Sequence, residues 1–349
     1  MKHIKLTAFI LTAALLIPVA LSCNKKNQPL TATYYEYFDT VSHIYSYAEE
    51  DEASFEKNTA VIEAELKEYH RLFDIYHEYS GMNNLRTVNL NAGIAAVKVD
   101  SRLIDFLLYA KEIYSLTEGE VNVAMGSVLS LWHKSRQDAE DSPETASLPD
   151  SDKLREAGEH IDIDSIVIDR DASTVYISDG KVSIDVGALG KGYAAERIAK
   201  MLKEKGVGSY VLDIGGNLRI IGQKPDGSGW VTGITDPKKD SSQSFAARVS
   251  ISDTSCVTSG SYERYYTVEG KNYHHIIDKD TLYPSEYFLS VTVITPDSGL
   301  ADALSTALFS MSYEDGAALI EKIGGIDALW ITADGERYST EGFGKMEIK

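Results

Sequence analysis

The stretch YVLDIGGNLRII, residues 210–221, places two apolar runs on either side of a pair of glycines. Both runs are rich in the aliphatic and aromatic residues that favour β-strands. Two glycines between such runs are typical of a type I′ hairpin turn, although they would equally let a ligand lie against bare backbone. The stretch therefore predicts strands at Tyr210–Ile214 and Leu218–Ile221, and antiparallel sheet around them.

Similar apolar segments lie on both sides of this hairpin, and segments with helical periodicity accompany them. Further strands are expected at Ser165–Ile168, Thr174–Ser178, Lys181–Asp185, Trp230–Ile234, Phe245–Ile251, Tyr265–Val268, Tyr273–Ile277, Leu289–Ile294 and Ala328–Thr332, with a strand or hairpin at Tyr34–Ala48. Helices are expected at Ala53–Tyr76, Ser101–Ser115, Lys191–Lys205, Leu300–Phe309 and Glu314–Ile323. We therefore predict an α+β fold in which helices pack on largely antiparallel sheets.

The 349 residues, of which 43% are hydrophobic, are sufficient for a large buried core. The segment Ser135–Asp152 is polar and contains two prolines, so it is interpreted as a surface connection. It would join an N-terminal half, residues 34–134, to a C-terminal half, residues 153–349, within a single domain covering residues 34–349.

The N-terminus has the pattern of an export signal. Residues 1–22 carry two lysines followed by an apolar run that is too short to remain as a membrane span. They end at Ala20-Leu21-Ser22-Cys23, which resembles a bacterial lipobox, so acylation of Cys23 is expected. Residues 23–33 would then be a lipidated tether that anchors an exported protein at the outer face of the cytoplasmic membrane or in the periplasm. A plain cleaved signal is the alternative.

Charge and cysteine content exclude several classes of protein. The net charge of −19 becomes −21 without residues 1–22, because that segment removes two lysines and no acidic residue. Such an acidic protein repels nucleic acid, so we expect no nucleic-acid partner. A bound polyanion would depend on local cations and backbone donors. Only two cysteines are present, so no disulfide framework is expected.

Two segments have residues suited to holding phosphate. Asp185–Tyr193 is a predicted strand end with glycines followed by a helix, whose first amides and Lys191 could bind a phosphate group. A tight turn with a surface lysine is the alternative. Thr258–Arg264 begins with hydroxyl-bearing and small residues that could anchor phosphate oxygens, or it could be an ordinary polar loop.

Two further segments carry candidate catalytic and metal-binding residues. His274 and His275 would point to opposite faces of a strand, so at most one of them can face a given pocket. Asp302 and Thr306 are four residues apart and share a helix face, where a carboxylate and a hydroxyl could bind one hard cation. An acid followed by a threonine at this spacing is also common in helices without metal.

Taken together and in order, six segments resemble the ApbE family of FAD:protein FMN transferases, which are flavin transferase lipoproteins. The family pattern D-x-G-x-x-x-K-G-Y, D-x-G-G-N, W-x-x-G-I-x-D-P, T-S-G-x-Y-E-R, H-H-I-I-D and A-D-A-L-S-T-A is met from Asp185, Asp213, Trp230, Thr258, His274 and Ala301 onward. The resemblance covers Phe38 to Phe309. It implies a T-fold-like ApbE architecture with FAD in a cleft between two sub-domains.

The resemblance also implies roles for individual residues. The implied Mg²⁺ ligands are the carbonyl of Ala188, the carboxylate of Asp302 and the hydroxyl of Thr306, with Asp302 and His275 as the catalytic residues. His275 is the implied general base, a role that the near-neutral pKa of histidine suits. The implied FAD contacts are Phe38, Tyr76, Glu120, Val121, Asn122, Asp185, Lys191, Thr258, Ser259, Gly260 and His275.

Three segments depart from the family pattern. Phe38-Asp39-Thr40 stands where Met-Gly-Thr is usual, and Glu120-Val121-Asn122 where Gly-Ala-Phe-Asp is usual. Residues 278–284, DKDTLYP, replace D-P-x-T-G-x-P, so a proline and a glycine are lost and this loop must turn differently.

The implied activity is Mg²⁺-dependent transfer of FMN from FAD to a Thr or Ser hydroxyl of an exported flavoprotein, with release of AMP. The acceptor would carry a Thr/Ser flavinylation motif. One alternative is a Mg²⁺-dependent FAD pyrophosphatase that yields FMN and AMP. The other is a flavin-binding surface lipoprotein without enzymatic activity.

Overall fold

The computed structural model describes residues 29–238 and 244–348. The expected signal segment and the lipidation site at Cys23 lie outside these residues. Within the described part, no helix has both the length and the apolar character that a membrane crossing requires.

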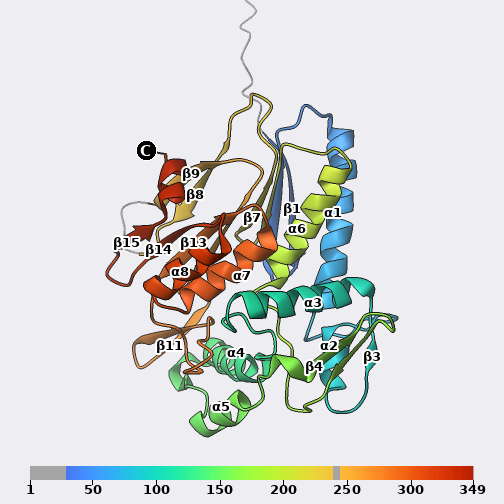
Figure 1. Cartoon of the computed structure of the whole chain (residues 1–349), viewed down its shortest axis with the longest axis vertical. Helices are drawn as coiled ribbons and strands as arrows, with labels where there is room; N and C mark the ends of the chain where they lie inside the picture. The colour runs from blue at the N-terminus through green and yellow to red at the C-terminus, as the bar shows by residue number, and fades with distance from the viewer. Residues whose placement is uncertain (1–28, 239–243, 349) are drawn as a thin grey trace, which may run out of the picture.

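Across residues 29–238 and 244–348, the largest element is an eight-stranded antiparallel sheet in the upper half of Figure 1. In spatial order its strands are β1 (Leu30–Tyr37), β2 (Thr40–Ser46), β6 (Tyr210–Ile214), β7 (Asn217–Ile221), β10 (Ser255–Gly260), β13 (Ser290–Thr295), β14 (Asp327–Ile331) and β15 (Arg337–Ser339). The hairpin predicted at residues 210–221 is confirmed as β6–β7.

The two faces of this sheet are buried under different elements. One face is covered by α1 (Glu52–Phe73), α6 (Gly190–Glu204), α7 (Ser298–Phe309) and α8 (Tyr313–Ile323). The other is covered by the β8–β9 hairpin (Trp230–Thr235, Phe245–Ile251) and α9 (Glu341–Met346). Strand alternation explains the division, since Leu212 packs in the core under the helices and its neighbour Val211 packs under β8–β9.

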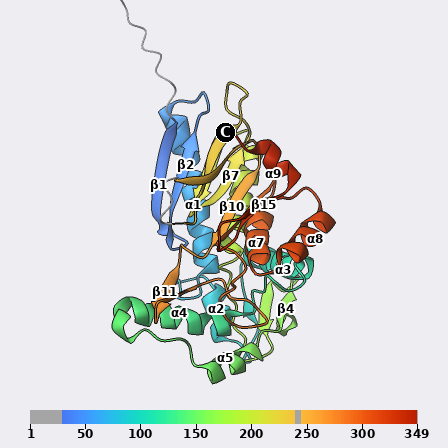
Figure 2. The same ribbon diagram turned by 90° about the vertical axis from the view of Figure 1, so that its left-hand side faces the viewer.

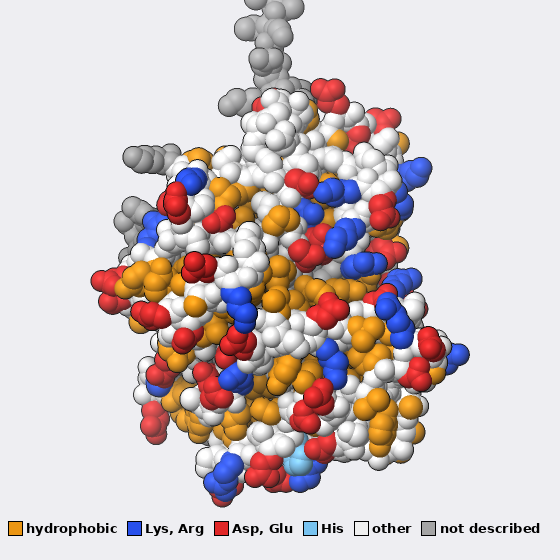
Figure 3. Space-filling model, in the orientation of Figure 1, with side chains coloured by type: hydrophobic (Ala, Val, Ile, Leu, Met, Phe, Trp, Pro, Cys, Tyr) orange, Lys and Arg blue, Asp and Glu red, His pale blue; other side chains and the backbone are white. Residues whose placement is uncertain are grey.

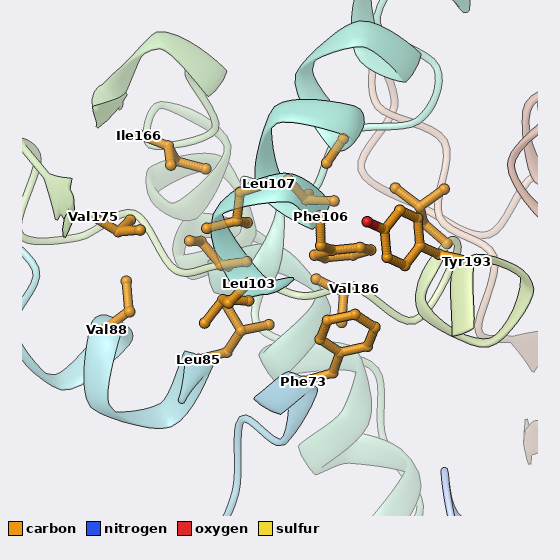
Figure 4. Packing of buried hydrophobic residues seen from close by; sticks show 14 of the residues in the cluster. Phe73, Leu85, Val88, Leu103, Phe106, Leu107, Ile166, Val175, Val186 and Tyr193 are labelled. Carbon is orange, nitrogen blue, oxygen red and sulfur yellow. The ribbon is translucent and has the colours of Figure 1, made fainter. Parts of the chain in front are cut away.

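A second part of the molecule lies below the sheet in Figures 1 and 2. It contains α2 (Leu85–Leu90), α3 (Ser101–Leu116), α4 (Gly126–Asp141), α5 (Ser151–Gly158), a small antiparallel sheet of β3 (Val97–Lys98), β5 (Thr174–Ile177) and β4 (Ile166–Asp169), and the hairpin of β11 (Tyr265–Val268) and β12 (Lys271–His274). Figure 4 shows its core, in which Leu103, Phe106 and Leu107 of α3 meet Phe73 and Tyr193.

The α+β prediction with antiparallel sheets is confirmed, but three local expectations differ. Residues 135–141 continue helix α4, and residues 151–152 begin α5, so most of the predicted connection is short helices. Residues 181–185 form no named strand; Asp185 instead donates its peptide N–H to the carbonyl of Val123. The threonine and serine at 258 and 259 lie on β10 and not in a loop.

The predicted N-terminal and C-terminal halves are interleaved in space. Strand β2 pairs with β6, and β3 pairs with β5, so each part of the molecule uses both halves of the chain. On the face shown in Figure 3, acidic and basic side chains are interspersed, and the negative net charge is not gathered into one patch there.

Candidate active site

A single cleft of about 1270 Å³ collects every residue predicted to contact a nucleotide or a metal. Its lining includes Phe38, Tyr76, Glu120, Val121, Asn122, Asp185, Ala188, Lys191, Thr258, Ser259, Gly260, His275, Asp302 and Thr306. These residues come from both the large sheet and the part below it. The volume exceeds the range of about 300–1,000 Å³ typical of sites for drug-sized ligands, so it suits a dinucleotide.

The cleft forms where neighbouring strands of the large sheet end together. Ser42 pairs with Ile214, so the β1–β2 turn at Phe38 and Asp39 and the β6–β7 turn at Gly215 and Gly216 lie at the same end. Gly215 and Gly216 have φ of 57° and 87°, as a type I′ turn requires. A Cβ on Gly215 would lie 2.3 Å from the hydroxyl oxygen of Thr40, so glycine lets the two turns touch.

Strand β10 extends past this end and supplies hydroxyl groups. It pairs with β7 only at Ser255 and Cys256, and continues to Gly260 beside β13. The Ser259 hydroxyl lies 2.8 Å from that of Ser305 and 3.3 Å from that of Thr306 on α7. The Thr258–Gly260 segment is therefore held next to the helix that carries the candidate metal ligands.

Asp302 and Thr306 lie one turn apart on α7, as the spacing predicts. The Asp302 side chain is buried, and its Oδ2 accepts the peptide N–H of Gly192 at 2.8 Å. Its Oδ1 lies 3.8 Å from Lys191 Nζ. These two donors hold the buried carboxylate in a fixed position.

Gly192 allows this contact because it has no side chain. A Cβ there would lie 2.3 Å from the carbonyl oxygen of Ser298 and 2.4 Å from Asp302 Cβ. The first turn of α6 can therefore press directly against α7. Close packing of the two helices brings Ala188, Lys191 and Asp302 to the same cleft.

The two adjacent histidines have different roles. Both ring nitrogens of His274 are used inside the protein, since Nδ1 accepts the N–H of Ile276 and Nε2 donates to the carbonyl of Ser285 at 2.7 Å. His275 has its Nδ1 3.2 Å from the carbonyl oxygen of Arg264, so this nitrogen carries the proton and Nε2 holds the lone pair. Of this pair, only His275 can therefore accept a proton in the cleft.

His275 remains neutral over the whole physiological range. Although its side chain is exposed to the cleft, the surrounding protein desolvates the ring, and together with the nearby Arg264 this lowers its pKa to about 3. The near-neutral pKa expected from the sequence is therefore not found in the cleft without nucleotide.

The residues that the family resemblance predicts at the flavin are here called the flavin wall, and they come from three separate segments: Phe38, Tyr76 and Glu120-Val121-Asn122. The Phe38 peptide N–H donates to His70 Nδ1 at 3.2 Å. The Tyr76 ring lies 5.5 Å from that of His133 on α4, at 33°. Asn122 uses its amide to hold the local backbone, donating to Ile161 and accepting from Ala124.

Two glycine-rich turns present partly buried carboxylates to the same cleft. Asp185 accepts the N–H of Gly187, and Asp213 accepts the N–H of Gly216, each at 2.9 Å. Burial raises the pKa of both carboxyl groups. In these contacts each carboxylate is bound by a backbone N–H and not by a lysine or arginine. Each could therefore accept a hydrogen bond from a polar group of a ligand.

Several cleft residues were not predicted from the sequence. His70 joins the flavin wall through Phe38, and Tyr79, which donates to the buried Asp74 at 2.7 Å, lies 3.5 Å from His70 Nε2. His133 and Arg264 also line the cleft. No local pattern marks His70, Tyr79 or His133, because each lies on an ordinary helix or loop and acquires its position from tertiary packing. Arg264 ends the T-S-G-x-Y-E-R pattern, but its place in the cleft was not predicted from that pattern.

The altered loop at 278–284 turns by other means than proline and glycine. The Asp278 carboxylate accepts the N–H groups of Asp280 and Thr281 at 2.9 and 2.8 Å. Leu282, which stands where the family pattern has glycine, adopts φ of 62°. The expectation that this loop must turn differently agrees with these contacts.

Within the described part of the chain, no group of three or more His, Cys, Asp or Glu side chains could hold a metal. A metal in the cleft would therefore need mixed oxygen ligands. The carboxylate of Asp302, the hydroxyl of Thr306 and the backbone at Ala188 are such a set, and hard divalent cations prefer oxygen.

Comparisons with known proteins agree with this geometry. A family model described as the ApbE family matches residues 38–330. The FAD:protein FMN transferase of Treponema pallidum is 34% identical over 264 residues, 72% of this chain and 71% of its own. That of Haemophilus influenzae is 27% identical and covers 91% of this chain and 90% of its own.

Solved structures show the same fold. The crystal structure of the ApbE protein from Thermotoga maritima has a TM-score of 0.80 and 27% identity, covering 92% of this chain and 100% of that one. The flavin transferase ApbE from Vibrio cholerae has a TM-score of 0.74 at 24% identity, covering 91% and 100%.

Proposed function

Because this chain belongs to the ApbE family, we propose that it is a FAD:protein FMN transferase that uses Mg²⁺ to move the FMN half of FAD onto a Thr or Ser hydroxyl of another protein, releasing AMP. The observation that carries this proposal is the convergence of Asp302, Thr306 and Ala188 with His275 and Lys191 in one dinucleotide-sized cleft. These residues come from segments that together span more than a hundred positions of the chain, from Ala188 to Thr306.

The donor set fits a magnesium ion. Asp302 supplies one buried carboxylate, while Thr306 and the Ala188 carbonyl supply neutral oxygens. When bound there, Mg²⁺ would neutralise charge on the two phosphates of FAD as the bond to AMP breaks. The Gly192 amide and Lys191 keep the carboxylate oriented toward the cleft.

His275 is the group that would receive the acceptor's proton. Its Nδ1 is held by the carbonyl of Arg264, which fixes the ring and directs the lone pair of Nε2 away from that contact. Lys191 would contact a phosphate oxygen, and Thr258 and Ser259 would add hydroxyl donors. The oxygen of the acceptor hydroxyl would form the new bond to the FMN phosphorus as the bond to the AMP oxygen breaks.

The proposed partner is an exported flavoprotein with a D-x-x-[ST]-G-[AS]-[ST]-type acceptor motif. A lipid anchor at Cys23 would hold the enzyme outside the cytoplasm, at the outer face of the membrane or in the periplasm, where such acceptors fold. The acidic composition supports small-molecule and protein partners over nucleic acid.

Hydrolysis of FAD to FMN and AMP is the second candidate. It is favoured by one observation, which is that the side chain of His275 is exposed to the open cleft. Water could therefore take the place of the acceptor hydroxyl and use the same residues.

The deciding experiment incubates the protein without residues 1–22 with FAD, Mg²⁺ and an acceptor domain. Flavin fluorescence on the acceptor band in a denaturing gel, together with AMP release, would support transfer. AMP without labelled acceptor would support the pyrophosphatase, and FAD left intact would support a flavin carrier. Asp302→Asn should abolish AMP release, whereas the control Asp171→Asn, on an exposed turn outside the cleft, should not.

A further inference from the structure

Two of the positions that depart from the family pattern contact each other. Glu120 stands where the pattern has alanine, and Lys279 where it has proline. In the structure Lys279 Nζ lies 3.3 Å from Glu120 Oε1. Alanine and proline, the residues of the family pattern at these two positions, could not form this ion pair. The two departures therefore introduce side chains of opposite charge that contact each other.

The pair is partly withdrawn from water. The side chains of Glu120 and Lys279 are only 13% and 24% exposed. Burial raises the pKa of Glu120, and Lys279 opposes that effect. Burial also disfavours charge on Lys279, but Asp280 and Glu120 outweigh it and raise its pKa. Removing Lys279 would leave the Glu120 charge poorly solvated, which is costly, whereas Lys279 without Glu120 would keep its 2.7 Å contact with the Asp280 carboxylate.

The loop that carries Lys279 is otherwise anchored on its far side. The indole N–H of Trp132 donates to the carbonyl of Leu282 at 2.9 Å. The Leu282 side chain packs so closely on α5 that a Cβ on Gly158 would lie 2.5 Å from its Cδ1. Through Glu120, Lys279 adds a contact between the near side of this loop and the flavin wall.

We propose that the Glu120–Lys279 ion pair is a positioning device that fixes the Asp278–Pro284 loop against the flavin wall and thereby sets the affinity for FAD. This inference rests on the proposed function only in naming FAD as the ligand. The loop begins three residues after His275, which directly follows the end of β12, so the same tether also restrains the segment that carries this residue.

The physical effect is a shift between two states of the loop. With the pair intact, the docked loop is the dominant state, and FAD binds a wall that is already formed. Without the ion pair, part of the free energy of FAD binding is used to dock the loop. The apparent dissociation constant for FAD is then the intrinsic constant divided by the fraction of molecules with a docked loop. Once FAD is bound the wall is the same, so kcat should change little.

The test compares Glu120→Gln, Lys279→Gln and the double variant. Each single variant should weaken FAD binding about fivefold, measured by flavin fluorescence titration, and should raise the KM for FAD by more than it lowers kcat. The double variant should also lose about fivefold, because the second change removes a tether that is already broken. The control variants Glu156→Gln and Lys181→Gln break an exposed pair of 2.8 Å and should leave binding unchanged.

Hydrogen exchange separates this inference from the function itself. Amides of residues 278–284 should exchange faster in Glu120→Gln than in the unchanged protein, without any ligand. Unchanged exchange, unchanged FAD affinity, or single effects that multiply to about 25-fold in the double variant would each overturn the inference. A protein that shows the exchange effect but binds no FAD would instead overturn the proposed function.

Discussion

The contact between α6 and α7 is tested most directly by Gly192→Ala. The added Cβ would lie 2.3 Å from the Ser298 carbonyl oxygen and 2.4 Å from Asp302 Cβ, so the helices must move apart by about 1 Å. Overpacking of this kind costs about 1–3 kcal/mol. The movement would also break the 2.8 Å bond from the Gly192 amide to Asp302.

Because a displacement of about 1 Å in a catalytic site can cost about 100-fold in rate, we expect Gly192→Ala to lower the rate of AMP release from FAD by about that factor. The melting temperature should fall by a few degrees, and the far-ultraviolet circular dichroism should be unchanged. The matched control is Gly208→Ala, where a Cβ meets nothing within 4 Å. Activity of Gly192→Ala within twofold of the unchanged protein would refute the claim that this close approach positions Asp302.

Three further results are expected. Asp302→Asn can still accept the Gly192 amide but lacks the charge, so activity should fall by at least about 100-fold and need more Mg²⁺; a Mg²⁺ titration checks this. Since the pKa of His275 is about 3 in the fold and 6.5 in a model peptide, the unfolded chain binds the extra proton between these values. Stability should thus fall as pH drops through that window, and less so in His275→Gln, as melting curves would show. The Cys256 thiol is buried, which raises its pKa to about 12, so in a Cys23→Ser protein it should react with a thiol reagent only after unfolding.

The sequence contained enough to predict the α+β class and the site, for a definite reason. Gly, Asp and Lys at strand and helix ends form local patterns, as at Asp185–Tyr193. Such patterns can be recognised in the sequence before the packing of the chain is known. The helical spacing of Asp302 and Thr306 likewise places both side chains on one face. The convergence of these residues in one cleft was predicted from the family resemblance, because no single segment shows by itself which other segments it will contact.

Other features could not be predicted, because they depend on strand register. Thr258 and Ser259 are polar residues on a strand, and they are tolerated there because β10 continues past β7 and their hydroxyls bond to Thr292 and Ser305. The polar composition of residues 135–152 concealed the end of α4 and the start of α5. These helices bury only a few side chains, such as Ala139 and Leu154, so their apolar signal is weak.

The histidine pair shows how two neighbouring residues of the same type acquire different contacts and different roles. His274 is neutral because burial lowers its pKa and its Nδ1 accepts the N–H of Ile276, whereas His275 is neutral because desolvation and Arg264 disfavour its charge. A base with a pKa near 3 accepts a proton poorly by itself. The two phosphates of FAD would place negative charge beside the ring and raise that pKa, since a nearby anion favours imidazolium. His275 would therefore become an effective base only when the substrate is present, and this expectation follows from the Arg264 contact and the cleft, not from the sequence motif.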